Sequence, residues 1–163
     1  MKILGAHVVF HRLLRTKSAS SVSAVLLCKR TQDAPMHAGY WGLIGGTLND
    51  SEEPMSGALR EIEEELGISQ TEISLNFLCD VRIQRNANRI EIGARYFTAP
   101  LERGMDRLTL KYNFEEKKVE GDGLGWFTAE EVHHLWIRPE DRIAVEKFFE
   151  QSGLQQAAAR DAP

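Results

Sequence analysis

The chain has 163 residues, of which 42% are hydrophobic and 27% are charged, a composition typical of one folded domain with a sizeable core. The net charge is −4 and there is no basic stripe, which argues against nucleic acid as a partner held through its phosphate backbone. No apolar run reaches transmembrane length and the first residues do not resemble a signal peptide, so we expect a cytoplasmic protein with no membrane partner.

Hydrophobic patterning predicts two strands near the start of the chain. Residues 3–14 alternate loosely between apolar and polar, and residues 22–29 form an apolar run typical of a buried strand. A loop over residues 31–39 then leads to residues 41–48, which contain the pair Gly45-Gly46. Cys28 and Cys79 each lie in a predicted strand without metal-ligand spacing, so we expect two small buried side chains in a reducing compartment.

A helix is predicted immediately after this segment. Pro54 suits the first turn of a helix, apolar residues recur at three- and four-residue spacing up to Leu66, and Gly67 suits the end. At about 100° per residue, Glu61, Glu64 and Glu65 fall on one side of this helix, away from the apolar stripe, whereas Glu63 points elsewhere.

The second half of the sequence predicts both strands and helices. Strands are expected over residues 73–83 and 89–99, around an Asn-rich turn at residues 86–88, and residues 101–120 suggest a loop and a charged strand. A short strand ends at Trp126-Phe127, and Thr128-x-x-Glu131 is a capping box that opens a helix. Pro139 starts a last helix that is expected to end near Gln151. We therefore predict one domain over residues 1–152 and a flexible C-terminal tail over residues 153–163.

The acidic face of the central helix is costly unless something neutralises it. Like charges three or four residues apart cost about 0.2–0.5 kcal/mol per pair, and carboxylates near a helix C-terminus oppose the helix dipole. A solvated acidic surface is the simpler interpretation of such a run. A divalent cation explains the clustering better, because carboxylate oxygens are ligands that suit Mg²⁺ and Mn²⁺.

The segment from Gly46 to Ile68 reads G-x5-E-x7-R-E-(apolar)-x-E-E-x-G-(apolar). This pattern resembles the Nudix box, complete at every fixed position. The resemblance implies the α/β Nudix fold, a mixed β-sheet sandwiched between α-helices. It also implies an enzyme that uses Mg²⁺ or Mn²⁺ to hydrolyse nucleoside diphosphates linked to another group.

The resemblance further implies roles for individual residues. The implied metal ligands are Glu61, Glu64, Glu65, the backbone carbonyl of Gly45, and an acidic residue from a later loop, for which Glu120 is chosen over Glu115, Glu116 and Asp122. The implied catalytic residues are Arg60, Glu61, Glu64 and Glu120, and either Glu61 or Glu120 is the general base. Arg60 and Glu52 are expected to brace the loop that contains Gly46 against the helix.

Substrate contacts are less specified by the sequence. Arg30 resembles a position that meets a substrate phosphate, and Arg82 and Arg95 are weaker candidates. Tyr40 and Trp41 suit either stacking on a base or core packing. We expect four of the five histidines to be surface or partly buried residues rather than ligands, namely His7, His11, His133 and His134.

The favoured function is therefore a metal-dependent pyrophosphohydrolase, in which water attacks a phosphorus atom of a small nucleotide. The expected substrate is a nucleoside triphosphate or a nucleoside diphosphate joined to a sugar or similar group. The choice between them stays open because no subfamily marker follows the Nudix box. Two alternatives stay open: removal of pyrophosphate from RNA 5′ ends, and a catalytically silent module that senses nucleotides or binds a partner. The sequence also leaves open whether the chain forms a homodimer.

Overall fold

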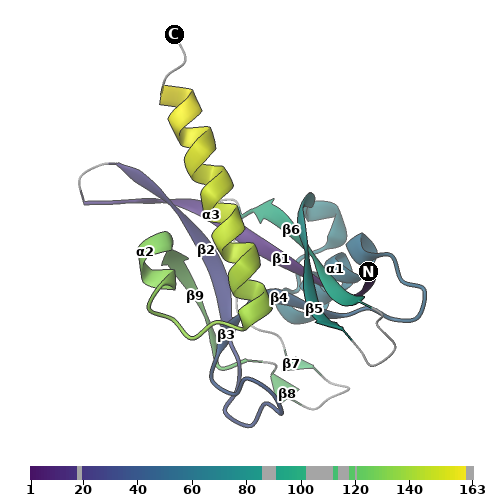
Figure 1. Cartoon of the computed structure of the whole chain (residues 1–163). Coiled ribbons are helices and arrows are strands. Elements are labelled where there is room, and N and C mark those ends of the chain that lie inside the picture. Colours follow the sequence, from purple (N-terminus) through teal and green to yellow (C-terminus); the bar gives the residue numbers. More distant parts are fainter. Residues whose placement is uncertain (18–19, 86–90, 102–111, 114–117, 120, 161–163) are drawn as a thin grey trace.

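The computed structural model describes residues 1–17, 20–85, 91–101, 112–113, 118–119 and 121–160. These residues form a seven-stranded mixed sheet (Figure 1). Its strands are β1 (Lys2–Arg15), β2 (Ser21–Lys29), β3 (Trp41–Gly42), β4 (Ile44–Thr47), β5 (Asn76–Arg85), β6 (Glu91–Pro100) and β9 (Gly123–Thr128). Two further strands, β7 (Tyr112–Asn113) and β8 (Lys118–Val119), form a separate antiparallel pair.

The long strand β1 organises the sheet. It pairs in parallel with β6 and antiparallel with β2 and β4, while β5 pairs antiparallel with β6 at the edge. The strands β3 and β9 both pair antiparallel with β2. The register between β1 and β4 aligns His7 with Gly45, so the glycine pair lies directly against the centre of the sheet.

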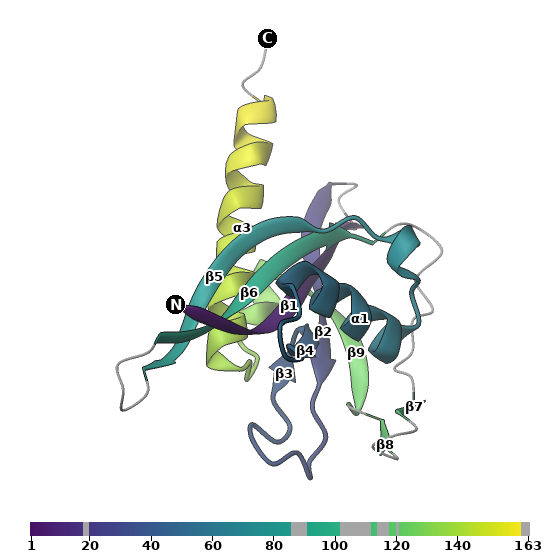
Figure 2. The same cartoon turned by 90° about the vertical axis from the view of Figure 1, so that its right-hand side faces the viewer.

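Helices cover both faces of the sheet. Their bounds are α1 (Pro54–Leu66), a short 3-10 turn η1 (Gln70–Glu72), α2 (Ala129–Val132) and α3 (Pro139–Arg160). In Figure 2, α1 and α3 lie on opposite sides of the sheet. One buried cluster joins α1 to Ala6, Val8 and Phe10 of β1, and the other joins α3 to residues of the opposite face, including Val9. This arrangement confirms the predicted α/β class and the sheet between helices.

The helix α1 has the predicted bounds. Pro54 occupies its first turn, and Gly67 ends it in the left-handed conformation, with φ of 71° and its N–H donating to the carbonyl of Glu63 at 3.0 Å. The capping box of Thr128 and Glu131 opens α2 as predicted.

Two predicted boundaries are wrong. Ser69 and Glu72 form a capping box that opens η1, so β5 begins at Asn76 rather than at residue 73. The last helix continues to Arg160 instead of ending near Gln151, because Gln, Ala and Arg, which dominate its last turns, are good helix formers. The predicted turn at residues 86–88 lies outside the described residues, as does most of the segment 101–120.

Cys28 and Cys79 are both buried, as predicted, and neither forms a disulfide. Within the described residues, no helix has the length and apolar character needed to cross a membrane.

Candidate functional site

Arg60 lies at the centre of the acidic cluster on α1. Its Nε and Nη2 atoms donate to the two carboxylate oxygens of Glu52 at 2.9 and 3.0 Å, and Nη2 also donates to the carbonyl of Thr47 at 3.1 Å. Its Nη1 atom donates to Glu61 at 2.9 Å and to Glu64 at 3.1 Å. These five contacts match the five N–H donors of a guanidinium group, and they link the end of β4, the following loop and α1 through one side chain.

Glu52 is the counterpart of Arg60 in the loop before α1. Besides its fork-like pair with Arg60, Glu52 accepts a hydrogen bond from the backbone N–H of Asn49 at 2.9 Å. The Arg60 hydrogen bonds, together with the Asn49 N–H, lower the pKa of the Glu52 carboxyl group to about 2. The predicted bracing partners are therefore in direct contact, and Glu52 stays charged over the whole neutral range.

The glycines of the segment allow close packing that a side chain would prevent. A Cβ atom at Gly46 would lie 2.5 Å from Oε1 of Glu61, so the lack of a side chain there lets this carboxylate take its observed position beside the backbone of β4. A Cβ atom at Gly57 would collide with Leu48 and meet Glu52 at 3.1 Å, so this glycine makes room for the loop residues.

Gly45, the first residue of the glycine pair, contacts the carboxylate of Glu65. Its backbone has a φ of 134°, and a Cβ atom there would collide with the carbonyl oxygen of Ala6. Its N–H donates to Oε1 of Glu65 at 3.4 Å. Both residues line a small cavity of about 40 Å³ together with Arg30, for which the sequence suggests a phosphate contact. The structure thus brings Gly45, Glu65 and Arg30 to one place.

The carboxylates Glu61 and Glu64 converge on one cationic group, Nη1 of Arg60, while Glu65 turns toward Gly45. Within the described part of the chain, no three His, Cys, Asp or Glu side chains surround a common point closely enough to hold a metal ion. Mutual repulsion of the carboxylates and neutralisation by Arg60 explain this arrangement. The donor set still suits Mg²⁺ or Mn²⁺, because it consists of carboxylate and backbone oxygens around a point that already attracts positive charge.

The remaining candidates differ in their surroundings. Glu120 lies outside the described residues, as do Glu115 and Glu116, whereas Asp122 is exposed just before β9. Arg95 forms a two-pronged ion pair with Asp80 at 2.8 and 2.9 Å, and Arg82 contacts Glu91 at 3.1 Å. Both arginines thus pair with carboxylates of the β5–β6 ladder.

An aromatic face lies beside Arg30. The backbone N–H of Arg30 donates to the carbonyl of Tyr40, whose ring meets Trp136 edge-on with centroids 5.6 Å apart. Trp136 is 71% exposed, which is unusual for so large an apolar side chain. By contrast, Trp41 packs against Phe127 at the edge of the core. Sequence reasoning missed Trp136, although a Trp in the connection between two helices was a visible signal.

A buried polar network lies on the other side of the glycine loop. Asp141 of α3 is fully buried, and it accepts hydrogen bonds from the Leu43 N–H at 2.9 Å and from the Tyr96 hydroxyl at 3.0 Å. His7 is only 6% exposed and stacks on Tyr96, so the expectation of a surface or partly buried side chain was wrong. Burial lowers the pKa of His7 to about 4 against the opposing effect of Asp141, so His7 is neutral near pH 7.

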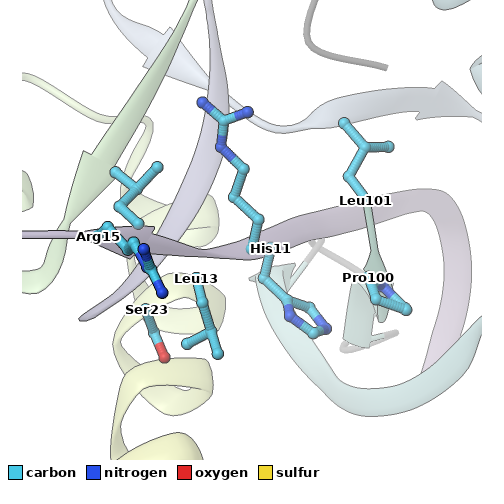
Figure 3. A pocket seen from close by; sticks show the side chains of 8 residues that line it. His11, Leu13, Arg15, Ser23, Pro100 and Leu101 are labelled. Atoms are coloured by element: carbon cyan, nitrogen blue, oxygen red, sulfur yellow. The ribbon is translucent and has the colours of Figure 1, made fainter. Parts of the chain in front are cut away.

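A larger hollow, with a volume of about 580 Å³, lies along β1 between His11 and Arg15 and is also lined by Pro100 and Leu101. Figure 3 shows that its labelled side chains spread over both sides of the strand rather than converging on one point. Its lining contains cationic and apolar residues but no carboxylate among the described ones. The acidic cluster on α1 is therefore the better candidate for a metal-dependent site.

Comparisons with known proteins find relatives in both sequence and structure. A NUDIX domain model matches residues 7–148 of the chain. The nucleoside triphosphatase NudI of Escherichia coli is 28% identical in an alignment of 142 residues that covers 80% of this chain and 89% of NudI. A 50-residue stretch is 46% identical to Nudix hydrolase 8 of Arabidopsis thaliana, covering 31% of this chain and only 13% of that relative's length.

The solved structures show the same fold. A mutT/nudix family protein from Listeria innocua superposes with a TM-score of 0.71 at 20% sequence identity. The superposition covers 94% of this chain and 96% of the Listeria chain. At this identity the likeness concerns the fold alone.

Proposed function

Because this chain belongs to the Nudix family, we propose that it is a metal-dependent hydrolase that cleaves a phosphoanhydride bond of a small nucleotide, with a nucleoside triphosphate as the favoured substrate. The carrying observation is the convergence of Glu61 and Glu64 on one cationic point, at 2.9 and 3.1 Å from Nη1 of Arg60. The alignment with a nucleoside triphosphatase over most of both chains supports the choice of substrate class over a nucleotide sugar.

The proposed metal ligands are Glu61, Glu64, Glu65, the Gly45 carbonyl and Glu120. A bound divalent ion such as Mg²⁺ supplies a Lewis acid that polarises phosphoryl oxygens and lowers the pKa of water. Arg60 holds the carboxylates of α1 near one another and ties them to the loop through Glu52. The proton of the attacking water passes to Glu61 or to Glu120, the two carboxylates proposed as the base.

Arg30 and the aromatic face are proposed to bind the nucleotide. Arg30 lines the cavity together with Glu65 and Gly45, and its Nε atom donates to the carbonyl of Met36 at 3.2 Å. This position beside the proposed metal ligands supports a contact between its guanidinium group and a phosphate. Tyr40 lies next to Arg30 and meets the exposed Trp136 edge-on, and the Trp136 ring offers an apolar face for a base. The two features together fit an anionic phosphate chain that carries an aromatic base.

Turnover of free nucleotides tests the proposal. The protein is incubated with Mg²⁺ and a panel of nucleoside triphosphates and nucleotide sugars, and the release of phosphate and pyrophosphate is followed. We expect turnover of at least one compound, reduced at least about 100-fold in Glu64→Gln and in Glu65→Gln because each removes a proposed ligand charge. The matched control is Glu63→Gln, an exposed carboxylate of the same helix that accepts from Gln70 at 3.2 Å and should keep wild-type turnover.

The same assay separates the alternatives. An enzyme that acts on RNA 5′ ends would release pyrophosphate from a 5′-triphosphorylated RNA and leave the free nucleotides intact. A silent sensing module would bind nucleotides without turnover. Wild-type activity in Glu64→Gln or Glu65→Gln would contradict the metal assignment.

A further inference from the structure

Asp141 carries a buried charge that the proposed chemistry does not use directly. Within the part of the chain that the structure describes, it is the one acidic side chain that is fully buried. Its Oδ2 atom accepts from Arg138 Nε at 2.7 Å, from Arg138 Nη2 at 2.6 Å and from the backbone N–H of Leu43 at 2.9 Å. Its Oδ1 atom accepts from the Tyr96 hydroxyl at 3.0 Å. A buried carboxylate is tolerated only with such complete pairing.

This carboxylate belongs to a set of bonds that joins the start of α3 to the strand before the glycine pair. The Trp41 N–H donates to the Trp136 carbonyl at 2.7 Å, and the Arg138 N–H donates to the Trp41 carbonyl at 3.0 Å. A Cβ atom at Gly42 would lie 3.0 Å from both Arg138 Nε and Asp141 Oδ2. The backbone of residues 41–43 is therefore held directly against the ion pair.

The held segment ends two residues before Gly45, whose N–H donates to Glu65 at 3.4 Å. The network also reaches Gly45 through a second route, since Arg138 Nη2 lies 3.5 Å from His7 Nδ1. A Cβ atom at Gly45 would in turn lie 2.9 Å from that same His7 nitrogen. Arg138 lines the small cavity together with Gly45 and Glu65. Gly45 is thus enclosed between the acidic helix on one side and the Asp141 network on the other.

We propose that Asp141 is a positioning residue: through the Leu43 N–H and the Arg138–His7 contact, it fixes the Gly45 backbone relative to Glu65 and thereby sets the affinity for the divalent cation. The catalytic consequence rests on the proposed function. The positioning itself does not, because it concerns backbone order and cation binding. A purely structural Asp141 would change the stability of the fold and leave the cation affinity of the folded protein unchanged.

The test compares Asp141→Leu with Tyr96→Phe. Leu has a similar volume but no acceptor oxygen, so it removes the bonds to the Leu43 N–H and to Arg138. Tyr96→Phe removes one hydrogen bond to Asp141 and leaves the Leu43 bond in place. We expect the dissociation constant for Mn²⁺, measured by electron paramagnetic resonance without nucleotide, to rise about tenfold in Asp141→Leu and less than about twofold in Tyr96→Phe. Equal constants in folded Asp141→Leu and wild type would overturn the proposal.

A second measurement uses the wild-type protein and needs no variant to fold. If the held segment and the cation site are coupled, Mg²⁺ alone must slow amide hydrogen exchange in residues 41–43, because linkage between two sites is reciprocal. We expect exchange there to slow at least about threefold and exchange in the β5–β6 ladder to stay unchanged. Unchanged exchange in residues 41–43 at saturating Mg²⁺ would overturn the proposal. If Mg²⁺ slows exchange but no nucleotide is hydrolysed, the proposed function fails while the positioning role stands.

Discussion

At the scale of single residues, Arg60 combines two tasks that a sequence pattern cannot separate. Its Nε and Nη2 atoms hold the loop through Glu52 and Thr47, and its Nη1 atom draws Glu61 and Glu64 together. A guanidinium group can do both because its donors are fixed in a planar fork. The residue therefore supports the loop and neutralises the acidic face at once.

Replacing Arg60 by Lys tests this dual role. An ammonium group offers three donors from one point and cannot pair with both oxygens of Glu52 while also reaching Glu61 and Glu64. We expect Arg60→Lys to lower the free energy of unfolding by about 1–3 kcal/mol, measured by urea denaturation. The matched control is Arg82→Lys, because Arg82 is 63% exposed and contacts a single carboxylate. This substitution should change the free energy of unfolding by less than about 0.5 kcal/mol. Equal effects of the two substitutions would contradict the assigned role.

At the scale of elements, the site depends on how closely β4 approaches its neighbours. The strand is four residues long, and its two glycines let it lie against β1 on one side and beside Glu61 on the other. Helix α1 places Glu61 and Glu65 at this strand because its opposite face, with Ala58 and Ile62, is buried in the core. The acidic cluster is thus a consequence of the amphipathic pattern of one helix and of the small residues in one strand.

Glycine-to-alanine substitutions in β4 and in α3 should change the free energy of unfolding in opposite directions. Gly45→Ala places a Cβ against the Ala6 carbonyl at a φ of 134°, and we expect a loss of at least about 3 kcal/mol in the free energy of unfolding. Gly153 lies within α3, and a methyl group added there would meet nothing within 4 Å, so Gly153→Ala should raise that free energy by about 1 kcal/mol. Thermal and urea unfolding measure both. A neutral Gly45→Ala would show that β4 can move away from β1.

At the scale of the whole molecule, local patterns predicted what depends on neighbours in sequence. The bounds of α1 follow from Pro54, an apolar period and Gly67, and the contact of Arg60 with Glu52 joins residues only eight positions apart. The Asp141 network could not be predicted in this way. An acidic residue in the first turn of a helix ordinarily complements the helix dipole at the surface, whereas Asp141 bonds to Leu43, 98 residues away. Its partners come from separate parts of the chain and leave no periodic signal.

That network should make the stability of the fold depend on pH through His7. Four groups surround His7: Asp141 of α3, Arg138 just before α3, Tyr96 of β6 and the backbone of Gly45 in β4. Burial lowers the pKa of folded His7 to about 4, against 6.5 in the unfolded chain. Between these values the unfolded chain binds more protons, so stability is fully present above pH 6.5 and falls as the pH drops toward 4.

Unfolding with urea at a series of pH values measures this loss, which should reach about 3 kcal/mol at pH 4 for His7. In His7→Gln the loss should shrink by that amount, even if the variant is less stable at every pH. The slope that persists includes His11, whose pKa burial also lowers. If His7→Gln keeps the wild-type slope, His7 is not buried in its neutral form, and the enclosure of Gly45 by this network is wrong.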